Sequence, residues 1–346
     1  MLSLRFASMA LVLSLLCVNA QAQTTPDQPS HSAQLPPIRV IAKHNKPHTA
    51  PAKPAPAAAA TASAQAPPAP PYVSGAPNIA GGAATAPTMA SQMTVTGQEL
   101  NALPVARPGE ILEVVPGLAV VMHADGGKAN QYYLRGYNLD HGTDLAIFVD
   151  DMPINLPSHA HGQGYADLNW LMPETVASLN IRKGPYFADV GDFATAGSLF
   201  INLRDSVDKT IAEATIGSFD YLRYFGMGAT RLGGGTLLYA GEANTYDGPW
   251  DTPDHMHKVS GLLRYSQGTA TDGFSATAMA YSNAWNSTDQ IPLRAIASGL
   301  IGLDGELDPT DGGDTSRLSL SARMAHTDDG GQWKANGYVV KYGLDL

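Results

Sequence analysis

The feature that most constrains the fold is a set of seven long segments in which side chains alternate in character. Residues 273–284 illustrate it, because Phe274 and Ala276 alternate with Ser275 and Thr277. Successive side chains of a β-strand point to opposite faces of a sheet, so this period of two predicts strands. Gly, Asp or Asn residues bound the segments, as expected of turns. The segments are 210–218, 221–231, 236–247, 257–267, 273–284, 315–327 and 332–344.

Two architectures are compatible with these strands. Strands of about 9–11 alternating residues suit a transmembrane barrel, but a soluble sandwich also alternates. A short turn at 232–235 and a long loop at 285–314 favour the barrel, whose two rims carry loops of different length. Tyrosines and tryptophans also gather at the strand ends, as in an aromatic girdle: Tyr246, Trp250, Tyr265 and Trp285.

The N-terminus predicts export from the cytoplasm. Residues 1–22 read as a signal peptide, with Arg5, a short apolar run and a small-residue cleavage site at 20–22. The only cysteine, Cys17, lies inside this segment, so the mature chain has no disulfide and no thiolate ligand. No later run reaches the roughly 18 apolar residues of a membrane-spanning helix. A membrane role would therefore need a barrel, and the net charge of −10 argues against nucleic acid as a partner.

Composition divides the remaining chain into three parts. Residues 23–92 contain one apolar patch, Ile38 to Ala42, followed by a stretch rich in Ala and Pro and without an acid from 47 to 90. Such a stretch buries too little apolar surface to fold, which predicts a disordered linker. Residues 93–207 predict an α/β domain, and residues 208–346 carry the alternating strands.

The α/β domain begins with helix signals. Thr96 and Glu99 fit a capping box, and Pro108 fits the first position of a second helix. Short apolar runs then predict strands, each between turn residues: 118–122, 131–135, 145–149 and 176–182.

Four short motifs in this domain are specific in combination. They are Leu134-Arg135-Gly136, Val149-Asp150-Asp151-Met152-Pro153, Lys183-Gly184-Pro185 and Ala196-Gly197-Ser198. In this order and spacing, residues 93–207 resemble the plug domain of TonB-dependent outer-membrane receptors, and 208–346 resemble the first strands of their barrel. The family usually has Asp-Gly where this chain has Asp150-Asp151, and Gly-Gly where it has Ala196-Gly197.

The resemblance implies a set of functional residues. Arg135, Gly136, Asp150, Pro153, Lys183, Gly184, Pro185 and Gly197 match the plug motifs that couple plug and barrel. Ile38, Arg39, Val40, Ile41 and Ala42 resemble the TonB box, an extended segment that would add as a strand to TonB in the periplasm. The alternative is an apolar patch in a disordered tail. No cofactor and no enzymatic activity are expected, and the partners would be TonB, outer-membrane lipid and a small extracellular ligand.

Several residues are candidates for contacting that ligand. Asp140, His141, His159 and His161 could lie on the outer face of the plug, and the i, i+2 spacing of His159 and His161 would place both rings on one side of an extended segment. Imidazole suits zinc, copper, nickel or iron, whereas the alternative is that these histidines fix loops by hydrogen bonds. On the strands, the charged side chains expected to face the lumen, as ligand contacts or as ordinary polar lining, are Arg223, Glu242, Arg264 and Arg323.

Receptors of this type need about 22 strands, and seven strands would leave open edges in lipid. The chain is therefore expected to be the N-terminal part of a longer receptor that imports an iron chelate or another metal complex. The alternatives are a plug-based ligand sensor that does not transport, an inactive truncated fragment, or a soluble secreted β protein.

Overall fold

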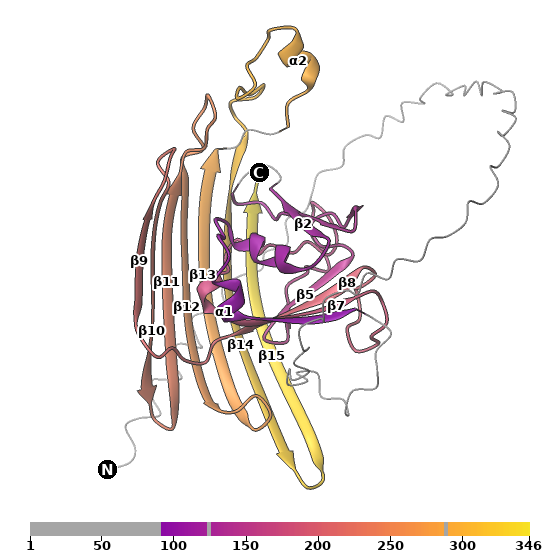
Figure 1. Ribbon diagram of the computed structural model, residues 1–346, viewed down its shortest axis with the longest axis vertical. Helices are drawn as coiled ribbons and strands as arrows, with labels where there is room; N and C mark the ends of the chain where they lie inside the picture. Colours follow the sequence, from indigo (N-terminus) through magenta and orange to yellow (C-terminus); the bar gives the residue numbers. More distant parts are fainter. Residues whose placement is uncertain (1–90, 123–125, 287–289) are drawn as a thin grey trace, which may run out of the picture. The chain divides into compact units, whose positions relative to one another are not determined.

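The computed structural model describes residues 91–122, 126–286 and 290–346, all within one compact unit (Figure 1). The predicted signal peptide, the predicted TonB box and nearly all of the predicted linker lie outside these residues. Within the described residues, no helix is long and apolar enough to cross a membrane.

Residues 91–207 form the first part of the structure, which we call the plug. A five-stranded sheet in the order β1-β7-β8-β5-β6 forms its centre. A second sheet has three strands, in the order β2-β3-β4. Strands β5 and β8 are parallel, and the other pairs are antiparallel. The strands are β1 (Gln92–Thr96), β2 (Leu118–Val121), β3 (Gln131–Leu134), β4 (Tyr137–Asn138), β5 (Leu145–Val149), β6 (Met152–Pro153), β7 (Val176–Lys183) and β8 (Gly197–Leu203).

The helices of the plug are short. The predicted capping box starts α1 (Gly97–Leu100): the Thr96 side chain accepts the Glu99 N–H, and the Glu99 carboxylate accepts the Thr96 N–H at 2.8 Å. Pro108 does begin the second helix, but this helix, η1 (Pro108–Val114), is a 3₁₀-helix. Together with η2 (Pro173–Thr175), it turns the chain between strands.

Two plug motifs are tight hairpin turns. Leu134 pairs with Tyr137 across Arg135 and Gly136, and Val149 pairs with Met152 across a two-residue loop of aspartates. Both loop residues have positive φ in each turn, at 54° and 84° in the first and 47° and 67° in the second. This is the two-residue turn that matches the twist of an antiparallel pair, and it explains why the motifs demand residues that tolerate a left-handed backbone.

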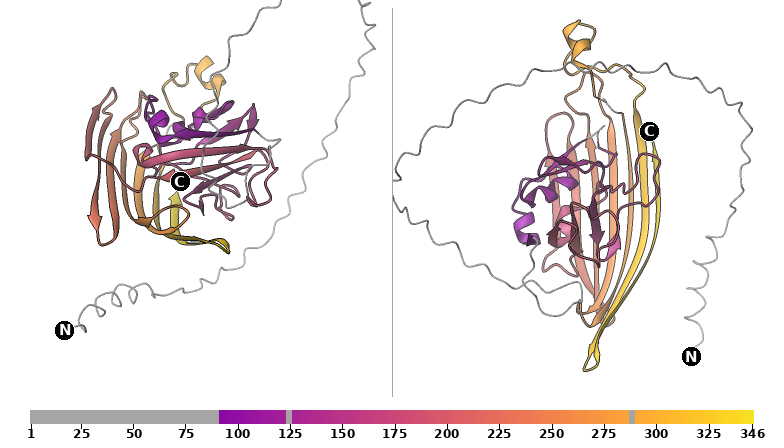
Figure 2. Two further views of the ribbon diagram at one scale, coloured as in Figure 1. Left: turned by 60° about the horizontal axis from the view of Figure 1, so that its bottom comes forward. Right: turned by 90° about the vertical axis from the view of Figure 1, so that its right-hand side faces the viewer.

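A seven-stranded antiparallel sheet follows, which we call the wall; its order is β15-β14-β13-β12-β11-β10-β9 (Figure 2). All seven predicted strands are confirmed, and their ends differ from the prediction by at most three residues. They are β9 (Ile211–Ile216), β10 (Leu222–Leu232), β11 (Gly235–Tyr246), β12 (Met256–Gly268), β13 (Gly273–Asn286), β14 (Gly312–Asp328) and β15 (Gly331–Asp345). The connections at 233–234, 269–272 and 329–330 are short. Those at the other rim are longer, and the longest contains α2 (Leu293–Ala297).

The two faces of the wall differ in a way opposite to that of a soluble protein. On the face that the plug covers, many side chains are polar and buried, for example Ser260, Thr277 and Thr315. On the other face, large apolar side chains such as Val259 and Leu320 are each 59% exposed. A polar inner face and an apolar outer face are the arrangement of a transmembrane barrel, and they do not fit a soluble sandwich.

The predicted aromatic girdle is wrong for two of its members, because Tyr246 lines a cavity together with plug residues and Trp285 packs against the plug. Trp285 is 4% exposed and faces the plug, where a Cβ added to Gly127 would lie 1.8 Å from its ring. The position of an aromatic residue near a strand end does not by itself indicate which face of the sheet its side chain occupies. For Trp285 the glycine of the plug makes room on the inner face.

Candidate functional site: the contact between plug and wall

A buried electrostatic contact joins the β5–β6 turn of the plug to strand β12. The Arg264 guanidinium forms an ion pair with Asp150, and its Nε donates to Asp205 at 2.9 Å. A further N–H donates to Thr277 on β13 at 2.8 Å, and the other Asp150 oxygen accepts the Leu203 N–H at 3.1 Å. Burial raises the pKa of Asp150, and Arg264 opposes that rise. The motif aspartate is thus buried together with the charge that compensates it.

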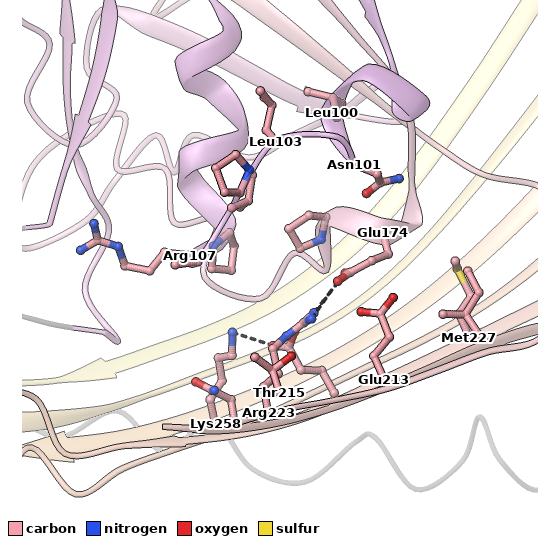
Figure 3. A pocket seen from close by; sticks show the side chains of 18 of the residues that line it. Leu100, Asn101, Leu103, Arg107, Glu174, Glu213, Thr215, Arg223, Met227 and Lys258 are labelled. Atoms are coloured by element: carbon pink, nitrogen blue, oxygen red, sulfur yellow. Dashed lines mark hydrogen bonds and ion pairs between the residues drawn. The ribbon is translucent and has the colours of Figure 1, made fainter. Parts of the chain in front are cut away.

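A second network runs from η2 across three wall strands, and Figure 3 shows Glu174 pointing toward Arg223. The Arg223 guanidinium binds Glu174 in a bidentate manner, with distances of 2.8 and 3.0 Å. Its Nε donates to Glu242 on β11 at 2.6 Å, and the Lys258 ammonium of β12 lies 2.6 Å from the other Glu242 oxygen. These side chains border a cavity of about 620 Å³ between plug and wall.

A third contact surrounds Asp167, a plug carboxylate that is 4% exposed. It accepts the Asn169 N–H at 2.8 Å and the Tyr342 hydroxyl of β15 at 3.3 Å. The Arg317 guanidinium of β14 lies over the Trp170 ring, 4.3 Å from its centroid. Its positive charge stabilises the ionised form of Asp167. Burial raises the pKa of Asp167 to about 6 in spite of these partners.

The other motif residues meet on a different side of the plug. Arg135, Lys183 and Gly184 line one cavity of about 550 Å³ together with Asp144. The Lys183 ammonium donates to the Pro116 carbonyl at 2.6 Å, and its pKa is lowered by burial and by Arg135. Within the described residues, neither cation forms an ion pair. The role of Arg135 and Lys183 in coupling plug and barrel stays a prediction.

The remaining motif positions have structural reasons of their own. A Cβ on Gly197 would lie 2.7 Å from the Arg182 carbonyl oxygen, so this position of β8 requires glycine. Gly184 has a φ of 87°, and Pro185 follows it in an exposed turn. Pro153 stands in β6 opposite Phe148. These residues shape the plug backbone and leave the ion pairs to their neighbours.

The predicted ligand residues lie close together in the plug. The His141 ring is buried, with Nδ1 at 2.7 Å from the Ala129 carbonyl oxygen, and its centroid is 4.5 Å from that of His161. His159 stacks on Tyr165 at 4.0 Å, and burial lowers its pKa. The Asp140 carboxylate lies 3.8 Å from His141 Nε2. In the part of the chain that the structure describes, no group of three or more His, Cys, Asp or Glu side chains is placed to hold a metal ion. A metal at His159 and His161 remains a prediction.

The four charged wall residues do face inward, as predicted. Three of them, all arginines, bind the plug, whereas Glu242 binds Arg223 and Lys258 of the wall. Arg264, Arg223 and Glu242 form the networks above, and Arg323 on β14 pairs with Asp151 at 3.3 Å. The plug acids Glu174, Asp205 and Asp167 were missed. The one signal that could have indicated these acids is their position in a domain expected to lie against strands with inward-facing arginines.

A domain of the plug type, docked on the polar face of a sheet of barrel strands, defines a plugged outer-membrane barrel as the class of fold. Residues 85–198 match the family described as TonB-dependent Receptor Plug Domain. Residues 85–198 are therefore a plug domain of the TonB-dependent receptor type.

Solved structures of similar fold agree. The copper transporter OprC is 19% identical with a TM-score of 0.54, over 72% of this chain and 36% of that one. The ferric-catecholate import receptor Fiu from K12 E. coli is 15% identical with a TM-score of 0.55, over 74% and 38%. The FrpB iron transporter from Neisseria meningitidis is 17% identical with a TM-score of 0.54, over 72% and 40%. The chain therefore spans well under half the length of these structures.

Proposed function

We propose that the protein acts in the outer membrane of a Gram-negative bacterium as a receptor that binds a small extracellular ligand and imports it into the periplasm. One observation carries the proposal: a plug domain sits on the polar face of a sheet whose opposite face is apolar. That opposite face suits lipid, and the covered face suits a lumen closed by the plug. Neither the proposed binding nor the proposed import involves covalent chemistry.

The similar structures support an iron chelate or another metal complex as the ligand, since they are those of a copper transporter, a ferric-catecholate import receptor and an iron transporter. A cavity of about 330 Å³ is a candidate place for it. Met122 and Asn130 of the plug and Tyr246, Met256 and Lys258 of the wall line this cavity. It lies at the rim with the longer connections, which in such barrels faces the outside. A contact of Asp140, His141, His159 or His161 with ligand is part of the same proposal.

TonB is the proposed partner for energy transfer, through residues 38–42. An extended segment can add to the edge of a TonB sheet by main-chain hydrogen bonds. Proline removes one backbone donor and cannot continue such a ladder. The segment rich in Ala and Pro that follows would act as a spacer between the TonB box and the plug. The signal peptide at 1–22 belongs to this proposal, since export must precede insertion.

The test is uptake by a Gram-negative host that lacks its own iron receptors and expresses the full receptor, with and without TonB. The probes are radioactive iron as its catecholate complex and copper ion. Import that requires TonB, and that Val40→Pro abolishes, supports the proposal. Ala58→Pro is the matched control, because it adds a proline to a segment already rich in them. Import of neither probe, or equal import without TonB, would refute it for these ligands.

A further inference from the structure

The second residue of the β5–β6 turn is one of the two positions at which this chain departs from the usual plug pattern. Asp151 has a φ of 67°, and Asp150 before it has a φ of 47°. A two-residue turn of this type favours glycine at its second position, because a Cβ is strained there. Aspartate tolerates the left-handed region better than most residues but less well than glycine. A glycine would thus form the same turn with less strain.

The Asp151 carboxylate gains contact with cations of the last two wall strands, whereas the backbone carbonyl of this residue makes a contact that glycine would keep. The Arg323 guanidinium of β14 donates to its carboxylate at 3.3 Å, and the Asn336 amide of β15 donates to its carbonyl at 2.9 Å. The Lys334 ammonium, also on β15, attracts the same carboxylate. The Arg323 side chain is 12% exposed and that of Asp151 is 30% exposed, so water screens this pair only in part.

The contact of Asp151 with β14 and β15 is separate from the ion pair that its neighbour Asp150 forms with β12. Asp150 pairs with Arg264 on β12, whereas Asp151 turns to β14 and β15. One turn thus fastens the plug to two different parts of the wall. Strand β5, which leads into it, is hydrogen-bonded to β8 within the central sheet of the plug. The sheet cannot leave the wall without breaking both contacts.

We infer that Asp151 is a docking residue, which fastens the β5–β6 hairpin of the plug to strands β14 and β15 and is kept in a strained turn for its carboxylate. The inference stands on contacts within the described residues and does not rest on the proposed import. It predicts that the residue better suited to the turn, glycine, is the worse one for docking.

The experiment is hydrogen exchange, followed by mass spectrometry, on the full receptor purified in detergent. The segments read are 145–155 and 331–345. Asp151→Gly is expected to speed exchange in both segments by about tenfold, the factor that corresponds to one charge-assisted hydrogen bond. Arg323→Gln is expected to do the same in the parent and to add nothing to Asp151→Gly. Arg323→Lys should restore part of the protection, and high salt should weaken the parent contact.

Arg231→Gln is the matched control, because Arg231 is an exposed arginine at the end of β10. It should leave exchange in both segments unchanged. Slower or unchanged exchange in Asp151→Gly would overturn the inference, since relief of turn strain would then dominate. An equal effect of Arg323→Gln with and without Asp151 would overturn it too, because the two side chains would not be coupled. Asp151→Asn, which keeps the turn tendency and removes the charge, decides between charge and shape.

Discussion

Replacement of Arg264 by methionine should lower the free energy of plug unfolding in a pH-dependent way. The Arg264 side chain is 4% exposed and pairs with Asp150, which is 7% exposed. Methionine keeps most of the volume of arginine but removes the positive charge. The buried Asp150 carboxylate would then keep the Leu203 N–H as a hydrogen-bond donor. Breaking a buried ion pair by removing one partner costs about 3–5 kcal/mol, because the other charge stays buried. We expect a loss of that size in the free energy of plug unfolding at pH 8.

The sign of the pH effect follows from the pKa of Asp150. Burial already raises this pKa above its ordinary value, and loss of Arg264 raises it further. The unfolded carboxyl has a pKa near about 3.9. Between that value and the raised folded pKa, the variant regains stability as pH falls, by about 1.4 kcal/mol per pH unit. The destabilisation should therefore be much smaller at pH 5 than at pH 8.

The assay is denaturant-induced unfolding of the plug in the detergent-purified receptor at both pH values. Arg231→Met serves as a control with the same change of side chain at an exposed position. Adding Asp150→Asn to the variant should recover much of the loss at pH 8, since no charge is then left buried. Equal losses at pH 5 and pH 8, or no recovery with Asp150→Asn, would refute the reasoning.

Three further predictions concern other contacts. Glu242→Leu should lower the free energy of plug unfolding by about 3 kcal/mol, because it leaves Arg223 short of one buried partner; chemical unfolding measures it, and a loss below about 1 kcal/mol would contradict it. Gly127→Ala should displace the plug segment from Trp285, whose ring a Cβ would overlap; an unchanged tryptophan emission spectrum would speak against this. Asp167→Asn should abolish the part of plug stability that falls as pH rises from about 4 to 6, the interval between its unfolded and folded pKa. Unfolding midpoints at pH 4.5 and 7.5 test this, and a pH dependence equal to that of the parent would exclude it.

The strands of the wall were predictable because their pattern is local. A period of two, interrupted by Gly, Asp and Asn, marks each strand. When this period continues over many residues, it is incompatible with the period of a helix. The capping box of Thr96 and Glu99 was predictable for the same reason. Strand β8 was known only as a motif and not as a strand. It is a short buried segment between two turns, where periodicity is a weak signal.

The candidate site was predictable only in its parts. The sequence indicated charged residues such as Arg223 and Arg264 on the inner face of the strands. It did not indicate that each finds a carboxylate of the plug, since those pairs join residues far apart in the chain: Glu174 with Arg223, and Asp150 with Arg264. The histidines are a further example. The i, i+2 spacing of His159 and His161 did not indicate that the His159 ring stacks on Tyr165.

The sequence by itself determined the seven strands, the helix cap, the turns and the resemblance of the first domain to a receptor plug. These depend on backbone preferences and on alternation along short segments, which neighbouring residues encode. Only the tertiary structure decided which face of the wall meets the plug, which charges pair, and why Asp151 stands where a glycine would fit more easily. Those outcomes depend on burial and on distances between separate segments, because a charge is stabilised in the interior only where folding brings its partner.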